Sequence, residues 1–159
     1  MSSFTAQWLA LREPADHAAR SVALTRAVFD ALPRDTPLRM LDLAAGTGSN
    51  LRYLTNGPTA GKAPGASFVG ADPRVHTVWL LVDHDPGLLA QVPAASGVET
   101  RCLELSTLDD RQIFDGRALV TASALLDLVS EEWLRVLAVR CAESGAAVLF
   151  ALSYDGRIV

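Results

Sequence analysis

Residues 40–49, Met-Leu-Asp-Leu-Ala-Ala-Gly-Thr-Gly-Ser, decide how this chain folds. The apolar run 38–43 predicts a buried strand that ends where the glycines begin. Gly46 and Gly48 allow a sharp turn in which the backbone approaches a ligand with no Cβ in the way. A helix that begins near Ser49 offers unpaired N–H groups and the positive end of its dipole. Strand, glycine turn and helix N-terminus in this order predict a cradle for a nucleotide-type cofactor.

The composition bounds the class of protein. The chain has 159 residues, 50% hydrophobic and 20% charged, so we expect residues 1–159 to form one domain with a substantial core. Its net charge of −4, without a cluster of Lys and Arg, argues against nucleic acid as the main partner. The sequence shows neither a signal segment nor an apolar run long enough to span a bilayer. We therefore expect a cytoplasmic protein without membrane contact.

Metal chemistry finds little support in the sequence. The two cysteines, Cys102 and Cys141, fall in a predicted strand and a predicted helix, where buried free thiols are expected. Because no His or Cys pair has metal-ligand spacing, the sequence predicts no metal site.

Two segments stand apart from the rest of the chain. Residues 1–33 predict a helical N-terminal cap that is interrupted around Glu13-Pro14. Val22, Phe29 and Leu32 form its expected inward-facing stripe. Residues 56–77 are rich in Gly and Pro, which predicts a flexible insertion at the surface.

The remaining chain alternates between apolar runs and helical patterns. A helix capped by Ser130 is expected to run through Cys141. This alternation predicts an α/β fold, a doubly wound and mostly parallel sheet covered by helices on both faces. Strands are expected, besides the first, at 78–82, 99–103, 118–122 and 146–152.

Four stretches of the sequence, taken in chain order, resemble motifs of the class I S-adenosylmethionine-dependent methyltransferases. Residues 41–48, Leu-Asp-Leu-Ala-Ala-Gly-Thr-Gly, resemble the first motif of that family, an acidic residue before a glycine-rich turn. Residues 81–86 resemble the acidic end of its second strand, residues 114–128 its fourth-strand region, and residues 145–152 its fifth strand. The resemblance implies a Rossmann-like fold and S-adenosylmethionine as the cofactor.

The same resemblance assigns roles to individual residues. Gly46 and Gly48 would pass beneath the methionine part of the cofactor, and Asp42 would act through the hydrogen bonds of the turn or on the cofactor's amino group. Asp83 would accept both ribose hydroxyls, because a carboxylate offers two acceptor oxygens. The full set of implied cofactor-binding positions is Asp42, Ala44, Gly46, Gly48, Asn50, Asp83, His84, Glu104, Leu105 and Ser123.

The ribose acid has a rival in the sequence. The spacing from Gly48 to Asp83 exceeds the about 20 residues that usually separate a glycine turn from its ribose acid. Asp72, at the end of the apolar stretch 67–71, has a more familiar spacing. We favour Asp83 because a helical pattern follows it directly, whereas too few residues separate Asp72 from the next strand to hold a helix.

The implied reaction is methyl transfer to a small-molecule acceptor. The sulfonium is already activated, so the protein mainly aligns donor and acceptor and excludes water. An oxygen acceptor would need a base, for which Asp127, His17 and His84 are the candidates. A nicotinamide-binding domain is a rival reading, which the missing third glycine of its fingerprint disfavours.

The end of the chain opens a further alternative. Family members usually continue past the fifth strand with a helix and an antiparallel hairpin, whereas this sequence ends at Val159. We therefore expect a domain truncated after strand five, with an open sheet edge that a second copy in a homodimer would cover. The alternative function is a truncated or non-catalytic cofactor-binding module that acts through a partner or a second copy.

Overall fold

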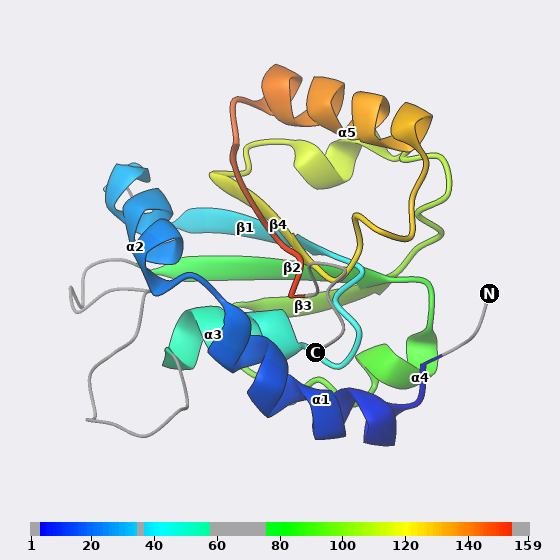
Figure 1. Cartoon of the computed structure of the whole chain (residues 1–159). Helices are drawn as coiled ribbons and strands as arrows, with labels where there is room; N and C mark the ends of the chain where they lie inside the picture. The colour runs from blue at the N-terminus through cyan, green and yellow to red at the C-terminus, as the bar shows by residue number, and fades with distance from the viewer. Residues whose placement is uncertain (1–3, 35–36, 58–75, 154–159) are drawn as a thin grey trace.

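A computed structural model describes residues 4–34, 37–57 and 76–153, and its centre is a sheet of parallel strands (Figure 1). The sheet has five strands in the order β3-β2-β1-β4-β5, and every neighbouring pair runs parallel. This arrangement confirms the predicted doubly wound α/β fold. The strands are β1 (Leu38–Leu43), β2 (Thr77–Asp83), β3 (Val98–Cys102), β4 (Leu119–Ser123) and β5 (Ala147–Ala151).

Helices cover both faces of the sheet (Figure 1). One face carries α5 (Glu131–Ser144) and the short helix η1 (Arg111–Phe114), and the other carries α3 (Ser49–Asn56) and α4 (Pro86–Leu89). The chain begins with α1 (Ala6–Ala19), which runs along the side of α3 and α4, and with α2 (Val22–Ala31).

The strands alternate between two apolar layers because successive side chains point to opposite faces. Leu41, Leu80 and Val120 pack under α5 and η1, whereas Met40 and Leu81 pack under α3 and α4. All five are at most 2% exposed. Since each such side chain contributes about 1.5–3 kcal/mol on burial, these two layers hold the strand ends in place.

The helical cap differs from its prediction. The expected interruption at Glu13-Pro14 is wrong, because α1 continues through Pro14 to Ala19. The break lies instead at Ser21, whose hydroxyl caps α2 by accepting a hydrogen bond from the Leu24 backbone N–H. Val22, expected to face inward, is 37% exposed because it is the first residue of α2, whereas Leu32 is buried as expected.

Two of the sequence expectations fall largely outside the described residues. Most of the insertion at 56–77 lies there, Asp72 included, although its ends belong to α3 and β2. The segment after Ser153 lies there too, and within the described part of the chain β5 has only β4 as a neighbour. Across that described part, none of the helices has the length and apolar character that crossing a membrane requires.

Candidate functional site

The first strand lies at the point where the strand order reverses. The chain moves from β1 to β2 on one side and later places β4 on the other side of β1. In open α/β sheets, ligands bind outside the carboxyl ends of the strands at such a switch point. The turn that follows β1 is therefore the candidate position for a ligand site.

That turn bends through three residues with positive φ. Ala44, Gly46 and Gly48 have φ angles of 52°, 55° and 84°. Glycine adopts this conformation without strain, whereas Ala44 is held in it at a cost of about 1 kcal/mol or more. Gly48 is also the N-cap residue of α3, and within the described structure no side chain caps this helix. The first turn of α3 therefore presents backbone N–H groups at the switch point.

Asp83 braces the glycine turn from the end of β2. Asp83 is buried, with 4% of the residue exposed. Oδ2 accepts a hydrogen bond from the Gly46 backbone N–H at 2.8 Å, and Oδ1 accepts one from the Asp85 N–H at 2.9 Å. The His84 Nδ1 lies 3.3 Å from Oδ1. Because each carboxylate oxygen has a second lone pair, Asp83 keeps acceptor capacity after bracing the turn.

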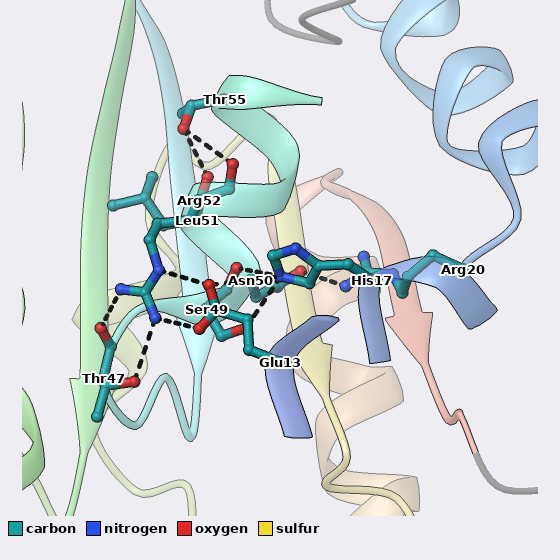
Figure 2. A network of polar contacts seen from close by, with 9 residues as sticks. All are labelled: Glu13, His17, Arg20, Thr47, Ser49, Asn50, Leu51, Arg52 and Thr55. Carbon is teal, nitrogen blue, oxygen red and sulfur yellow. Dashed lines mark hydrogen bonds and ion pairs between the residues drawn. The ribbon is translucent and has the colours of Figure 1, made fainter. Parts of the chain in front are cut away.

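His17 and Arg20 reach the first two residues of α3 from the helical cap (Figure 2), and the buried Asp42 of β1 reaches Asn50 from the sheet. The His17 Nε2 lies 3.1 Å from the Ser49 carbonyl oxygen, and the Arg20 Nη1 donates to the Asn50 Oδ1 at 2.8 Å. The Asn50 Nδ2 donates in turn to the Asp42 Oδ1 at 2.8 Å. Asn50 thus links a helix of the cap to the first strand.

Each of these three side chains also has a buried polar atom without a hydrogen-bond partner in the described structure. The atoms are the His17 Nδ1, the Arg20 Nη2 and the Asp42 Oδ2. Because the His17 Nε2 faces a carbonyl oxygen, it carries the proton of the neutral ring, and Nδ1 is an acceptor. Leaving such atoms unpaired costs about 1–3 kcal/mol each in stability, so a cluster of them is typical of a site that binds a polar ligand rather than of a packed core.

Burial dominates the electrostatics of this cluster. It raises the pKa of Asp42 to about 7, although the hydrogen bond from Asn50 and the charge of Arg20 act in the opposite direction. It also lowers the pKa of His17, which keeps the ring neutral at pH 7. The site therefore combines a neutral imidazole, a guanidinium and a carboxyl group that changes its charge near neutral pH.

The remaining predicted site residues lie at the ends of β2, β3 and β4. His84 is more than half exposed, and Glu104 is exposed with its Oε1 accepting from the Ser106 N–H. The Leu105 carbonyl accepts from the Trp133 indole at 2.6 Å. Ser123 ends β4, and Asp127 follows it on an exposed turn. The structure thus groups six of the predicted cofactor-binding residues closely, namely Asp42, Ala44, Gly46, Gly48, Asn50 and Asp83. Glu104, Leu105, Ser123 and Asp127 lie at the ends of the neighbouring strands.

In the described ranges, no group of three or more His, Cys, Asp or Glu could hold a metal ion.

The sequence reasoning gave little weight to one side of this site. From the sequence alone, Arg20 has two interpretations, part of a solvated helix face or a partner for the carboxylate of the cofactor, and Glu13 marks only the expected helix break. Glu13, His17 and Arg20 follow one another at helical spacing, so they share one face of α1. A buried polar stripe at that spacing is the signal by which they could be found.

The comparisons with known proteins concern the fold of the chain. No family model and no curated protein sequence matches the chain. Among solved structures, the plantazolicin methyltransferase BpumL in complex with SAH aligns with a TM-score of 0.55 and 10% identity over 90% of this chain and 47% of its own. Magnesium protoporphyrin IX methyltransferase from Synechocystis PCC 6803 with bound SAM aligns with a TM-score of 0.54 and 12% identity over 94% of this chain and 64% of its own.

A third similar structure is phosphoethanolamine N-methyltransferase 1 of Haemonchus contortus in complex with phosphoethanolamine and S-adenosylhomocysteine, with a TM-score of 0.54 and 14% identity. It is matched over 86% of this chain and 28% of its own. The chain thus spans between 28% and 64% of the length of these three proteins. At these identities the likeness concerns the fold, and this chain has the Rossmann-like fold of the class I S-adenosylmethionine-dependent methyltransferases.

Proposed function

We propose that this chain binds S-adenosylmethionine at the glycine turn and transfers its methyl group to a small-molecule acceptor. One observation carries the proposal. The three unpartnered buried atoms all belong to side chains that are joined by hydrogen bonds to the first two residues of α3, directly after the glycine turn. They are one donor and two acceptors, a combination that suits a ligand bearing both a carboxylate and an ammonium group.

The methionine part of the cofactor is such a group. Arg20 would donate to its carboxylate, which the N–H groups at the start of α3 would also attract. Asp42 and His17 would accept hydrogen bonds from its ammonium group. Charge matching supports this assignment, because a bound carboxylate offsets the buried guanidinium and a bound ammonium offsets the buried carboxylate. The residues present therefore fit the cofactor that the motifs imply.

The other proposed contacts follow from the strand ends. Asp83 would accept hydrogen bonds from the ribose hydroxyls with its remaining lone pairs, while it continues to brace the Gly46 N–H. His84, Glu104 and Leu105 would lie around the adenine. These assignments rest on their places at the carboxyl ends of β2 and β3.

The chemistry itself asks little of the protein. When bound, the cofactor supplies a methyl group that is already activated as a sulfonium. The chain would hold the donor in line with the acceptor and exclude water from the reacting atoms. For an oxygen acceptor, we propose Asp127 as the base, because it follows the end of β4 and is exposed, whereas His17 is buried against Ser49.

The helical cap has a part in this proposal. We propose that residues 1–33 close the cofactor site, since α1 supplies both His17 and Arg20 to the start of α3. The Asp16 Oδ1 also accepts a hydrogen bond from the Ser153 hydroxyl at 2.8 Å, which ties the same helix to the segment after β5. The acceptor would then approach beside α1, near the carboxyl ends of β4 and β5.

Calorimetric titration with S-adenosylhomocysteine and, separately, with NAD tests the proposal. We expect S-adenosylhomocysteine to bind and NAD not to bind. Arg20→Met should weaken the binding of S-adenosylhomocysteine by about a hundredfold, because it removes a charge-assisted hydrogen bond in a buried site. Arg26→Met is the matched control, since Arg26 lies exposed on α2.

Two outcomes would overturn the assignment. Binding of NAD alone would show that the turn serves a nicotinamide cofactor. Equal affinities of the wild-type protein and Arg20→Met would show that the ligand does not reach the buried cluster. A labelled-methyl transfer assay with candidate acceptors then separates a methyltransferase from a non-catalytic binding module.

A further inference from the structure

One arginine joins the glycine turn to the helical cap. Arg52 lies in the first turn of α3, and its guanidinium uses all three nitrogens (Figure 2). Nη1 donates to the Thr47 carbonyl oxygen at 2.7 Å, and Nη2 lies 3.3 Å from the Thr47 Oγ1. On its other side, Nε donates to the Glu13 Oε1 at 2.8 Å and Nη2 to the Glu13 Oε2 at 2.5 Å. A planar fork of this kind fixes both partners in direction as well as in distance.

The contacts with Thr47 act on the shape of the turn. Thr47 stands between Gly46 and Gly48, and a backbone with glycine on both sides has many conformations of similar energy. Its carbonyl oxygen and its hydroxyl are both held by the same guanidinium. The Arg52 Nη1 also lies close to Gly48, 3.6 Å from the position of a Cβ built on that glycine.

The contact with Glu13 acts on the helix that covers the turn. Arg52 is the main cause that lowers the pKa of Glu13, so the pair is charged at neutral pH. The same helix brings Leu9 over the turn, with its Cδ1 3.5 Å from the position of a Cβ on Gly46. It also brings His17 to Ser49. Three successive turns of α1 thus rest on the residues around the glycine turn.

We infer that Arg52 is a positioning residue for the cofactor site: it holds the glycine turn in its binding conformation and couples that conformation to the docking of α1 through Glu13. The inference rests on the proposed function and adds a residue that does not itself touch the cofactor. Loosening α1 should therefore loosen the turn, and loosening the turn should weaken binding of the cofactor. An ion pair that only stabilised the fold would not link these two events.

The test uses the full chain and three variants. Glu13→Gln removes the negative charge that α1 contributes to the pair with Arg52. Arg52→Lys keeps the charge but loses the fork. The double variant Glu13→Arg with Arg52→Glu restores an ion pair between α1 and α3, but its glutamate cannot donate to the Thr47 carbonyl. Two quantities are measured for each: the dissociation constant of S-adenosylhomocysteine by calorimetry, and amide hydrogen exchange of residues 46–48 and of α1 without ligand.

We expect Glu13→Gln and Arg52→Lys each to weaken binding by about tenfold and to speed exchange in both segments. The double variant should restore protection of α1 while the turn still exchanges fast and binding stays weak. Glu131→Gln is the matched control, because Glu131 pairs with Arg135 on the exposed face of α5, away from the site. It should change affinity by less than about twofold.

Three results would overturn the inference. The first is wild-type affinity in Arg52→Lys, which would show that the fork does not matter. The second is full recovery of affinity in the double variant, which would show that docking of α1 alone suffices. The third is fast exchange of α1 in Glu13→Gln with an unchanged turn. If the wild-type protein does not bind S-adenosylhomocysteine, the proposed function fails, while the exchange data without ligand still decide whether α1 and the turn are coupled.

Discussion

Two helices of this molecule begin in opposite ways. At the start of α5, the Ser130 hydroxyl accepts a hydrogen bond from the Trp133 N–H, and Glu131 and Glu132 place negative charge in the first turn. At the start of α3, Gly48 offers no side chain to cap the helix, and the first turn holds no acidic residue. From α1, His17 contacts Ser49, Arg20 contacts Asn50, and Glu13 pairs with Arg52 in the first turn of α3.

The difference shows what each helix end is built for. Acidic residues and a hydroxyl cap complement the positive end of the dipole, so the start of α5 is satisfied by its own sequence. A guanidinium near the same end of α3 adds positive charge to it, which favours the binding of an anionic ligand group there. The start of α5 serves stability, whereas the start of α3 would serve the ligand that we propose.

The largest expected effect concerns the charge of Asp42, and its absence would contradict the comparison between the starts of α3 and α5. Its pKa is raised by burial to about 7 in the folded protein, against 3.8 for an ordinary aspartate. Between these two values the folded state binds more protons than the unfolded state, so stability falls as the pH rises through this window. Above pH 7 the carboxyl group is ionised in both states, and the loss is complete.

We expect this group to lower the free energy of unfolding by about 3 kcal/mol between pH 4 and pH 7. Urea unfolding of the wild-type protein and of Asp42→Asn at several pH values measures it, because the difference between the two curves removes the contribution of other groups. Parallel curves would mean that Asp42 does not change its charge in this range. Burial would then not distinguish this carboxyl group from that of an ordinary aspartate.

Much of the fold follows from local signals in the sequence. The strand predicted at 38–43 has those bounds in the structure, because an apolar run between Pro37 and a glycine turn leaves little choice. The helix after Ser130 begins where its cap and acidic first turn place it. Asp83 was expected to end the second strand, and it does. In these cases the residues that decide the structure are neighbours in the chain.

The rest depends on contacts between distant segments. The expected break at Pro14 does not occur, although a proline inside a helix costs about 3 kcal/mol. Glu13 and His17, on either side of it, bind Arg52 and Ser49 of α3, and these contacts offset that cost. No local pattern in the sequence announces a pair that is 39 residues apart. The candidate site was therefore predictable on the side of the glycine turn but not on the side of α1.

A smaller effect sharpens the comparison through two glycines. Gly48 at the start of α3 and Gly145 at the end of α5 both have left-handed backbones, with φ of 84° and 69°. A Cβ on Gly145 would meet nothing within 4 Å, whereas one on Gly48 would lie 3.4 Å from the Val92 side chain. Alanine at either position should cost about 1 kcal/mol of stability through backbone strain.

Only Gly48→Ala should also affect the ligand, weakening the binding of S-adenosylhomocysteine by about tenfold, because its backbone strain falls within the turn that would hold the cofactor. Thermal unfolding and calorimetry of the two variants separate strain from binding. An equal loss of affinity in Gly145→Ala would mean that strain anywhere in the fold reaches the site, and the two glycines would not be different in kind.

The smallest effect concerns the satisfied helix end alone. Ser130→Ala removes the hydroxyl that caps α5, which should lower the free energy of unfolding by about 1 kcal/mol. Ser130 is the N-cap residue of α5, which lies on the face of the sheet opposite to α3, so the affinity for S-adenosylhomocysteine should stay within about twofold of the wild-type value. Denaturant unfolding and calorimetry on the same sample check both statements. If the start of α5 is purely structural, its cap should matter for stability but not for the ligand. A loss of affinity in Ser130→Ala would instead mean that the start of α5 also takes part in binding, and the contrast with α3 would fail.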